Sequence, residues 1–400
     1  MPFAFRRSRF VAAAVTLAAC GRDSVNPAGP VEHAPAIPSA ASLVVQPTIT
    51  VSSTPELYAE VNDVANRGAR LVLMPHTYTL DPTQPNGGRL ELQQDMSLQG
   101  VVGNAQAVII DASRLPATSY AIQDGATGAV RVGRGASSLE WITVSGAANG
   151  AANIETDLIS SVPSRVTISH VIASGSPRGI DVRNLGASSA GRVLVVNISN
   201  TESFGNVTGN GQGLRAVNTN GATGAVIRLT LQANNFHGNR IGALFANNNT
   251  SYGTVSVTST ADHFDRNGIG LGLAAGVSSG TMALYNVVSF SAQQSTFQNN
   301  VATPPPGVPV AGVTVEGGSS TVAGFTSFNT VSADLSAVQF GNNQNADLRA
   351  WGARSTVSLP AGTNNVASVT LRNVASALIA PPIASEPAEP AGTNVVSVVR

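Results

Sequence analysis

The chain has 400 residues with 22 basic and 22 acidic side chains, so its formal net charge is zero, and charged residues make up 11% of it. A typical globular protein has about 25% charged residues. The neutral balance argues against a nucleic-acid binder that works through a basic face, and we expect no nucleic-acid partner. The 40 Gly and 22 Pro residues would interrupt long helices, which argues against a helical bundle or a coiled coil.

The N-terminus has the pattern of a secretion signal. Three arginines precede an apolar stretch over residues 11–19, which is too short to span a bilayer as a permanent helix. The stretch ends in Leu-Ala-Ala-Cys20-Gly, and Cys20 is the only cysteine of the chain. This ending resembles a bacterial lipobox, which implies that residues 1–20 are a lipoprotein signal peptide and that Cys20 carries the lipid. An ordinary signal peptide cut near Ala19 and a twin-arginine export signal are the alternatives.

Residues 21–46 are predicted to be a tether between the lipid and the folded body. Prolines recur through a segment of Ala, Gly and Ser that has too little apolar surface to fold. Gly21 follows the cysteine in place of the Asp that often retains lipoproteins at an inner membrane. The lipobox resemblance therefore implies a place in the bacterial cell envelope, at the outer membrane or the cell surface.

One amphipathic helix is predicted over residues 54–67. Thr54 is placed as its N-cap, Pro55 as its first residue and Gly68 as its stop. The apolar residues of this helix recur at helical spacing; they are Leu57, Val61 and Val64.

Beyond the helix the chain repeats itself about every 30 residues, with apolar and polar residues alternating as in β-strands. Three landmarks recur: a phenylalanine, an asparagine shortly after it, and a strand that begins with glycine. The phenylalanines are Phe204, Phe236, Phe264, Phe297 and Phe328; the asparagines are Asn206, Asn239, Asn267 and Asn300; the glycines are Gly179, Gly213, Gly242, Gly270 and Gly312.

These repeats favour an all-β parallel β-helix over a β-propeller. A propeller blade needs about 40 residues in four antiparallel strands, and the tight hairpin signals of such strands are missing here. In a parallel β-helix each coil lies about 4.8 Å above the last, so that equivalent residues stack. We therefore expect the five phenylalanines to form one interior column and the asparagines to line a turn.

The start of the body resembles the right-handed parallel β-helix proteins of the pectate-lyase-like superfamily. The segments that carry the resemblance are the predicted helix and residues 71–78, 96–100 and 109–111. The resemblance covers residues 47–375 and implies a right-handed solenoid with the helix as an N-terminal cap. The Pro-rich segment 376–400, with a possible strand at Val395–Val399, is expected to cover the other end.

The resemblance also implies that activity, where present, lies on outward residues of neighbouring coils. Aligning the Gly-led strands gives one outward row and then a second; the rows are Asp181, Arg215, Leu244, Gly272, Thr314 and Gln339, and Arg183, Val217, Ala246, Ala274 and Glu316. Asp181 and Arg215 are expected to pair, either as a surface ion pair or, with Arg183, as part of a ligand-binding face. The alignment stacks no two carboxylates, so we expect neither a calcium cage nor a cofactor.

A second polar cluster surrounds the phenylalanine landmarks. Glu202, His237, Asp262 and Asp265 are the candidate catalytic residues, and His237 and Asp265 are expected to be neighbours on adjacent coils. His263 and Arg266 are candidate ligand-binding residues beside them. A carboxylate that orients a histidine is one way to build a general base, and the same residues would also suit a hydrated turn or a sugar-binding edge. No histidines have zinc-ligand spacing.

Three functions stay open at this stage. The first is a lipid-anchored surface protein, expected to be a monomer, that binds polysaccharide or another envelope component without catalysis. The second is a polysaccharide lyase or glycoside hydrolase, as the superfamily resemblance implies. The third is an adhesin-like structural protein with neutral faces.

Overall fold

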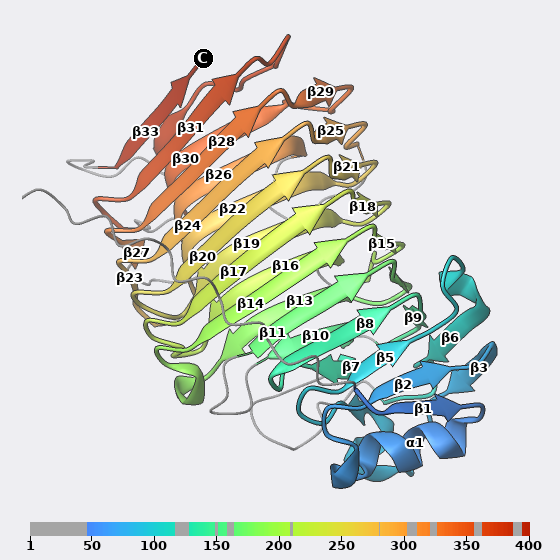
Figure 1. Cartoon of the computed structure of the whole chain (residues 1–400). Helices are drawn as coiled ribbons and strands as arrows, with labels where there is room; N and C mark the ends of the chain where they lie inside the picture. Colours follow the sequence, from blue (N-terminus) through green and yellow to red (C-terminus); the bar gives the residue numbers. More distant parts are fainter. Residues whose placement is uncertain are drawn as a thin grey trace, which may run out of the picture. The chain divides into compact units, whose positions relative to one another are not determined.

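The folded part of the chain is a stack of parallel β-strands (Figure 1). The computed structural model describes residues 46–116, 128–148, 151–157, 164–208, 211–279, 281–301, 310–320, 326–355, 362–386 and 394–400. The predicted signal peptide, its Cys20 and the tether up to residue 45 lie outside the described residues.

Three long sheets run along the stack, and every strand pairs in parallel with the equivalent strand of the next coil. Sheet A contains β1 (Thr48–Val51), β2 (Arg70–Leu73), β5 (Ser97–Gln99), β8 (Ala136–Glu140), β11 (Ser164–Ser169), β14 (Val193–Ser199), β17 (Val226–Gln232), β20 (Thr254–Thr260), β24 (Val287–Gln293), β28 (Thr330–Ser336), β31 (Val366–Arg372) and β33 (Val395–Val399).

Sheet B is formed by short strands, and sheet C by longer ones. Sheet B contains β3 (His76–Thr79), β6 (Val108–Asp111), β9 (Thr143–Ser145), β12 (Ile172–Ser174), β15 (Glu202–Phe204), β18 (Asn235–His237), β21 (His263–Asp265), β25 (Thr296–Gln298) and β29 (Gln339–Gly341). Sheet C contains β4 (Leu90–Glu91), β7 (Gly128–Val132), β10 (Ala152–Asp157), β13 (Arg178–Leu185), β16 (Gln212–Thr219), β19 (Ile241–Asn248), β22 (Ile269–Ser278), β26 (Ala311–Ser320), β30 (Leu348–Ser355) and β32 (Ile383–Glu386). The small sheet D pairs β23 (Ala283–Leu284) with β27 (Thr326–Ser327).

The chain passes from sheet A to sheet B to sheet C and back to sheet A, one coil at a time. For example, β14, β15 and β16 are followed by β17, which pairs with β14. The expected fold class is therefore confirmed: the protein is an all-β, right-handed parallel β-helix. A strand edge of one coil is covered by the next, which leaves edges only at the two ends of the stack.

Helix α1 (Thr54–Asn62) lies near β1 at the start of the stack, as Figure 1 shows. It is shorter than predicted, and its N-cap is Ser53, whose hydroxyl accepts a hydrogen bond from the amide of Glu56. Leu57 and Val61 are buried in the core as expected, whereas Val64 is 64% exposed. The reason is a break after Asn62, because the chain continues as a separate 3₁₀ turn, η1 (Val64–Asn66), which rotates Val64 away from the core.

Three further 3₁₀ turns complete the helical elements among the described residues. They are η2 (Pro85–Gly88), η3 (Ala105–Ala107) and η4 (Ala187–Ser189). None of the helices in the described ranges is long and apolar enough to cross a membrane.

The predicted interior phenylalanine column is correct in its centre and wrong at its ends. Phe236, Phe264 and Phe297 stack with ring centroids 5.4 and 5.0 Å apart, and Phe340 continues the column. Phe204 pairs in register with His237, one residue out of step, so its ring lies on the outer face. Phe328 is 45% exposed and stacks at a different turn.

The predicted asparagine ladder is present and satisfies a buried turn. Asn206 donates from its backbone and side-chain nitrogens to Oδ1 of Asn239, at 3.1 and 2.9 Å, and the backbone amides continue the pattern through Asn267 and Asn300. Glycine begins the next strand for a steric reason: a Cβ on Gly213 would lie 2.6 Å from Nδ2 of Asn239. Stacked amides of this kind pair groups that would otherwise be buried without partners.

Strand pairing continues to the end of the chain. β32 extends sheet C, and β33 pairs in register with β31 to extend sheet A. The segment predicted to cover the C-terminal end thus supplies the last strands of two sheets.

Candidate functional site

The outer face of sheet C carries a row of charged side chains on successive coils. Arg131, Glu155, Asp181 and Arg215 are directly paired in register on β7, β10, β13 and β16. Glu155 and Asp181 are both fully buried. The expectation that no carboxylates stack is therefore wrong: Glu155 was missed because its strand begins without the glycine used to align the others.

The predicted pair of Asp181 and Arg215 is present, and it is buried rather than superficial. Nε and one terminal nitrogen of Arg215 donate to the two carboxylate oxygens of Asp181, at 2.8 and 2.6 Å. Burial alone would raise the pKa of Asp181, but the attraction of Arg215, Arg183 and Arg178 outweighs it and lowers the pKa to about 2. Asp181 is thus a structural anion and a poor proton acceptor at neutral pH.

Glu155 is held in the same way by its own arginine. Arg183, the third predicted residue of this face, forms an ion pair with Oε1 of Glu155, and the backbone amide of Gly128 donates to Oε2 at 2.5 Å. The two stacked carboxylates therefore face guanidinium groups and a backbone amide. Such a set neutralises the carboxylates in place and does not form an open calcium site.

Next to this ionic row, an open groove crosses β16, β19, β22 and β26, with a volume of about 210 Å³. Leu244, Gly272 and Thr314 form its central row, in the register predicted from the Gly-led strands. The row ends at Arg349 and not, as predicted, at Gln339, because Gln339 belongs to sheet B. Gly272 keeps the groove open: a Cβ there would lie 3.1 Å from Leu244 and 3.6 Å from Thr314.

Two residues each have a buried polar atom without a hydrogen-bond partner among the described residues: Gln212 in the lining of the groove, and Arg349, which pairs in register with the lining residue Thr314. Gln212 lines the groove and is only 2% exposed, yet its Oε1 accepts no hydrogen bond. Arg349, at the end of the central row, has a buried Nε with no acceptor. Unsatisfied buried polar groups are costly, so the unpartnered Oε1 of Gln212 makes the groove a candidate place for a ligand that donates a hydrogen bond.

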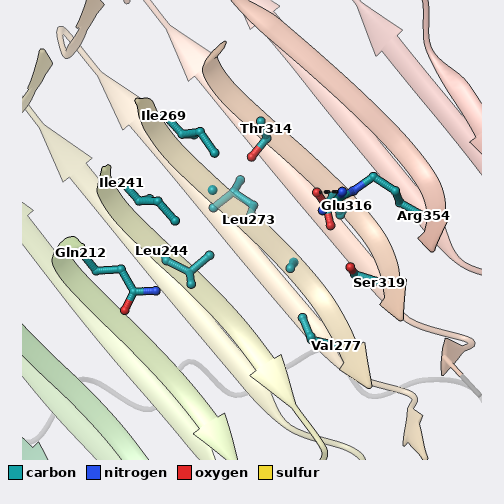
Figure 2. A pocket seen from close by; sticks show the side chains of 12 residues that line it. Gln212, Ile241, Leu244, Ile269, Leu273, Val277, Thr314, Glu316, Ser319 and Arg354 are labelled. Carbon is teal, nitrogen blue, oxygen red and sulfur yellow. Dashed lines mark hydrogen bonds and ion pairs between the residues drawn. The ribbon is translucent and has the colours of Figure 1, made fainter. Parts of the chain in front are cut away.

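The far end of the groove is closed by an ion pair that Figure 2 shows. Nε of Arg354 on β30 donates to Oε1 of Glu316 on β26 at 3.0 Å, and the guanidinium lies 5.6 Å from the ring centroid of the buried Trp351. Ion pairing and the aromatic face hold Arg354 in one orientation. Glu316 is the only carboxylate among the described residues that line the groove, and it is already neutralised.

The second predicted cluster lies on the outer face of sheet B. His237 pairs in register with Asp265 as expected, but its hydrogen bond goes to the coil below, from Nε2 to Oε1 of Glu202 at 2.7 Å. The imidazole also stacks on Phe204, with 5.2 Å between ring centroids. Glu202 and His237 therefore form a partly exposed acid–histidine pair with an aromatic support.

Asp265 is engaged by the next coil and not by His237. Its carboxylate accepts hydrogen bonds from the Thr296 hydroxyl at 3.1 Å and from the Gln298 amide at 3.0 Å. His263 shares Thr296 through a 2.9 Å contact with Nδ1. Arg266 occupies the following turn with a left-handed φ of 56°, and its side chain is exposed.

Asp262 is separated from this cluster because it lies inside the coil. Its Oδ1 accepts hydrogen bonds from the backbone and side chain of Asn234, both at 2.8 Å, and Oδ2 accepts from the Ser259 hydroxyl. Burial raises the pKa of Asp262 against the effect of these hydrogen bonds. Asp262 has no exposed surface and acts as part of the turn ladder. Among the described residues, no group of three or more His, Asp or Glu could hold a metal ion.

Comparisons with known proteins leave the activity open. No protein-family model matches the chain, and a search of curated proteins gives no match. Among solved structures, the A-module of mannuronan C-5 epimerase AlgE4 from Azotobacter vinelandii is 13% identical, with a TM-score of 0.42 over 86% of this chain and 95% of that one. Pectate lyase Pel9A is also 13% identical, with a TM-score of 0.40 over 80% of this chain and 72% of that one.

The catalytic unit of a thermostable GH87 α-1,3-glucanase from Streptomyces thermodiastaticus is similar at 13% identity, with a TM-score of 0.28 over 91% of this chain and 69% of that one. At such identity and structural similarity, function has to be argued from the side chains of this chain.

Proposed function

We propose that this protein is a lipid-anchored component of the bacterial envelope that binds a polysaccharide in the sheet C groove without cleaving it. The observation that carries the proposal is the groove itself, with its apolar centre at Leu244 and the unsatisfied Oε1 of Gln212. A sugar chain offers both apolar ring faces and hydroxyl donors, which match such a mixture of surfaces.

The charges around the groove support binding over catalysis. Glycoside hydrolysis needs two carboxylates that flank the bond, one of them able to donate a proton. Here Asp181, Glu155 and Glu316 each form an ion pair with an arginine, and the pKa of Asp181 is lowered to about 2. Groups fixed in this way can orient a ligand, and Asp181, with its lowered pKa, is poorly suited to accept a proton at neutral pH.

The test is a binding experiment with the groove blocked. Gly272→Phe would place a ring between Leu244 and Thr314, and Ser289→Phe is the matched control on the outer face of sheet A. Affinity electrophoresis in gels that contain alginate or polygalacturonate measures retardation of each variant. We expect at least one polymer to retard the wild type and Ser289→Phe but not Gly272→Phe. Equal retardation of all three proteins, or of none, would overturn the groove as the site.

A specific observation favours a second function, polysaccharide lyase or hydrolase. Glu202 orients a partly exposed His237, which is the arrangement of a carboxylate-supported base. The site would lie on sheet B and not in the groove. Release of unsaturated or reducing ends from the same polymers, abolished by His237→Ala, would establish this alternative.

A further inference from the structure

A column of exposed aromatic rings lies at the turn that leads from sheet C into sheet A. Tyr252, Tyr285 and Phe328 are 59%, 44% and 45% exposed. Their rings stack in parallel on successive coils, with centroid distances of 5.2 and 4.9 Å. Tyr285 and Phe328 follow directly after β23 and β27, which Figure 1 shows together at one edge of the stack.

The backbone at these three positions is strained. Each has a positive φ, between 55° and 59°, a conformation that bulky residues rarely adopt. On the two coils below, the hydrogen-bond register places Gly191 and Gly224 at the same position, where positive φ carries no steric cost. The fold accepts glycine here, so the aromatic residues are not needed to make the turn.

The end of the column leaves one ring face open. Gly224 lies directly below Tyr252 and has no side chain to cover it. A Cβ on Gly224 would meet only the backbone of Gly191 within 4 Å, at 3.9 Å, so the position next to Gly224 is open. At the other end, the register places Asn364 above Phe328.

A hollow with a volume of about 480 Å³ lies at the same turn. Thr223 and Ser251, the residues just before Gly224 and Tyr252, line it, together with Asn220, Asn249, Thr250 and Met282. Thr250 is 2% exposed, and its Oγ1 has no hydrogen-bond partner among the described residues. The described residues that line the hollow carry no charge, so they offer neutral amides and hydroxyls beside an aromatic face.

We propose that this corner is a second binding site, in which the ring of a neutral sugar stacks on Tyr252 while its hydroxyls bond to Asn220, Asn249 and Thr250. The ligand class follows from the chemistry: an exposed aromatic face covers the apolar side of a sugar ring, and neutral polar groups bond to its hydroxyls. The site is on a different face from the sheet C groove and does not depend on the function proposed for the groove.

The test uses substitutions that the turn accepts. Tyr252→Gly removes the ring and restores the residue found on the two coils below, so we expect no loss of thermal stability. Thr250→Val removes the unpartnered hydroxyl at nearly constant volume. Phe328→Gly is the matched control, because it removes a ring from the other end of the same column.

Affinity electrophoresis with xyloglucan, galactomannan and soluble amylopectin supplies the readout. We expect at least one of these neutral polymers to bind the wild type, Tyr252→Gly to weaken binding roughly tenfold, and Thr250→Val to weaken it about threefold. Phe328→Gly and the groove variant Gly272→Phe should bind as the wild type does. Failure of all three polymers to bind, or unchanged binding by Tyr252→Gly, would overturn the proposal without affecting the test of the groove.

Discussion

Both oxygens of the buried Asp181 carboxylate accept hydrogen bonds from Arg215 of the next coil, at 2.8 and 2.6 Å. Two further arginines lie near the same carboxylate: Arg178 at 3.8 Å and Arg183 at 4.0 Å. The pair therefore joins two coils of sheet C through charge as well as through backbone hydrogen bonds.

Removing the arginine of this ion pair while keeping the aspartate should destabilise the protein. Arg215→Met leaves Asp181 buried with weaker partners, and we expect a loss of about 3 kcal/mol in the free energy of unfolding, measured by urea denaturation. The double variant Asp181→Leu/Arg215→Met removes both charges and should recover most of that loss. A double variant as unstable as the single one would show that the charge of Asp181 is not the cause.

Acid should weaken the fold through the same carboxylate. The pKa of Asp181 in the folded protein, about 2, lies below its usual 3.8, so the ionised form stabilises the fold. This stabilisation is fully present above about pH 4 and is lost as the pH falls through 2, with a magnitude of roughly 2 kcal/mol. Unfolding free energies between pH 5 and pH 2 should fall less steeply for Asp181→Asn than for the wild type. Identical slopes would contradict the assignment.

Substitution of a buried asparagine of the ladder should lower the free energy of unfolding far more than substitution of an exposed asparagine. Asn239→Ala leaves the backbone and side-chain nitrogens of Asn206 without their acceptor, and we expect a loss of about 3 kcal/mol in unfolding free energy. Asn342→Ala is the matched control, because its 3.2 Å contact with Asn299 is exposed and should contribute less than about 0.5 kcal/mol. Comparable losses in the two variants would contradict the ladder's structural role.

The lipid anchor is a prediction about one atom, the sulfur of Cys20. If Cys20 carries the lipid, the wild-type protein expressed in a bacterial host should partition into the detergent phase, whereas Cys20→Ala should partition into the aqueous phase. A mass spectrum of the mature N-terminus identifies the modification directly. Detergent partitioning that survives Cys20→Ala would refute the anchor.

The sequence predicts the positions of residues that recur at regular spacing, and it fails where a residue is out of register with the next coil. The stacking of Phe236, Phe264 and Phe297, and of the asparagines beside them, follows from their regular spacing. Phe204 departs from its column because the next coil pairs Ser203, and not Phe204, with Phe236, and a shift of one residue reverses the face of a strand.

The candidate binding residues are harder to predict because their cues are irregular. Gln212 and Arg349 stand out only when buried atoms without partners are identified in three dimensions. The exposed column begins with two tyrosines and ends in Phe328, so a pattern built on phenylalanine alone assigned Phe328 to the interior. In a solenoid, position in the coil decides the role of an aromatic residue more than its type does.

The central claim is that the sheet C groove binds a polysaccharide and leaves it intact. The most direct measurement is light scattering of the polymer that the wild type retains, taken before and after prolonged incubation with wild-type and Gly272→Phe protein. We predict a complex with the wild type, none with Gly272→Phe, and an unchanged molar mass of the polymer. A steady fall in molar mass with the wild type would contradict the claim. If His237→Ala abolished that fall, the cleavage activity would be assigned to the His237 site on sheet B.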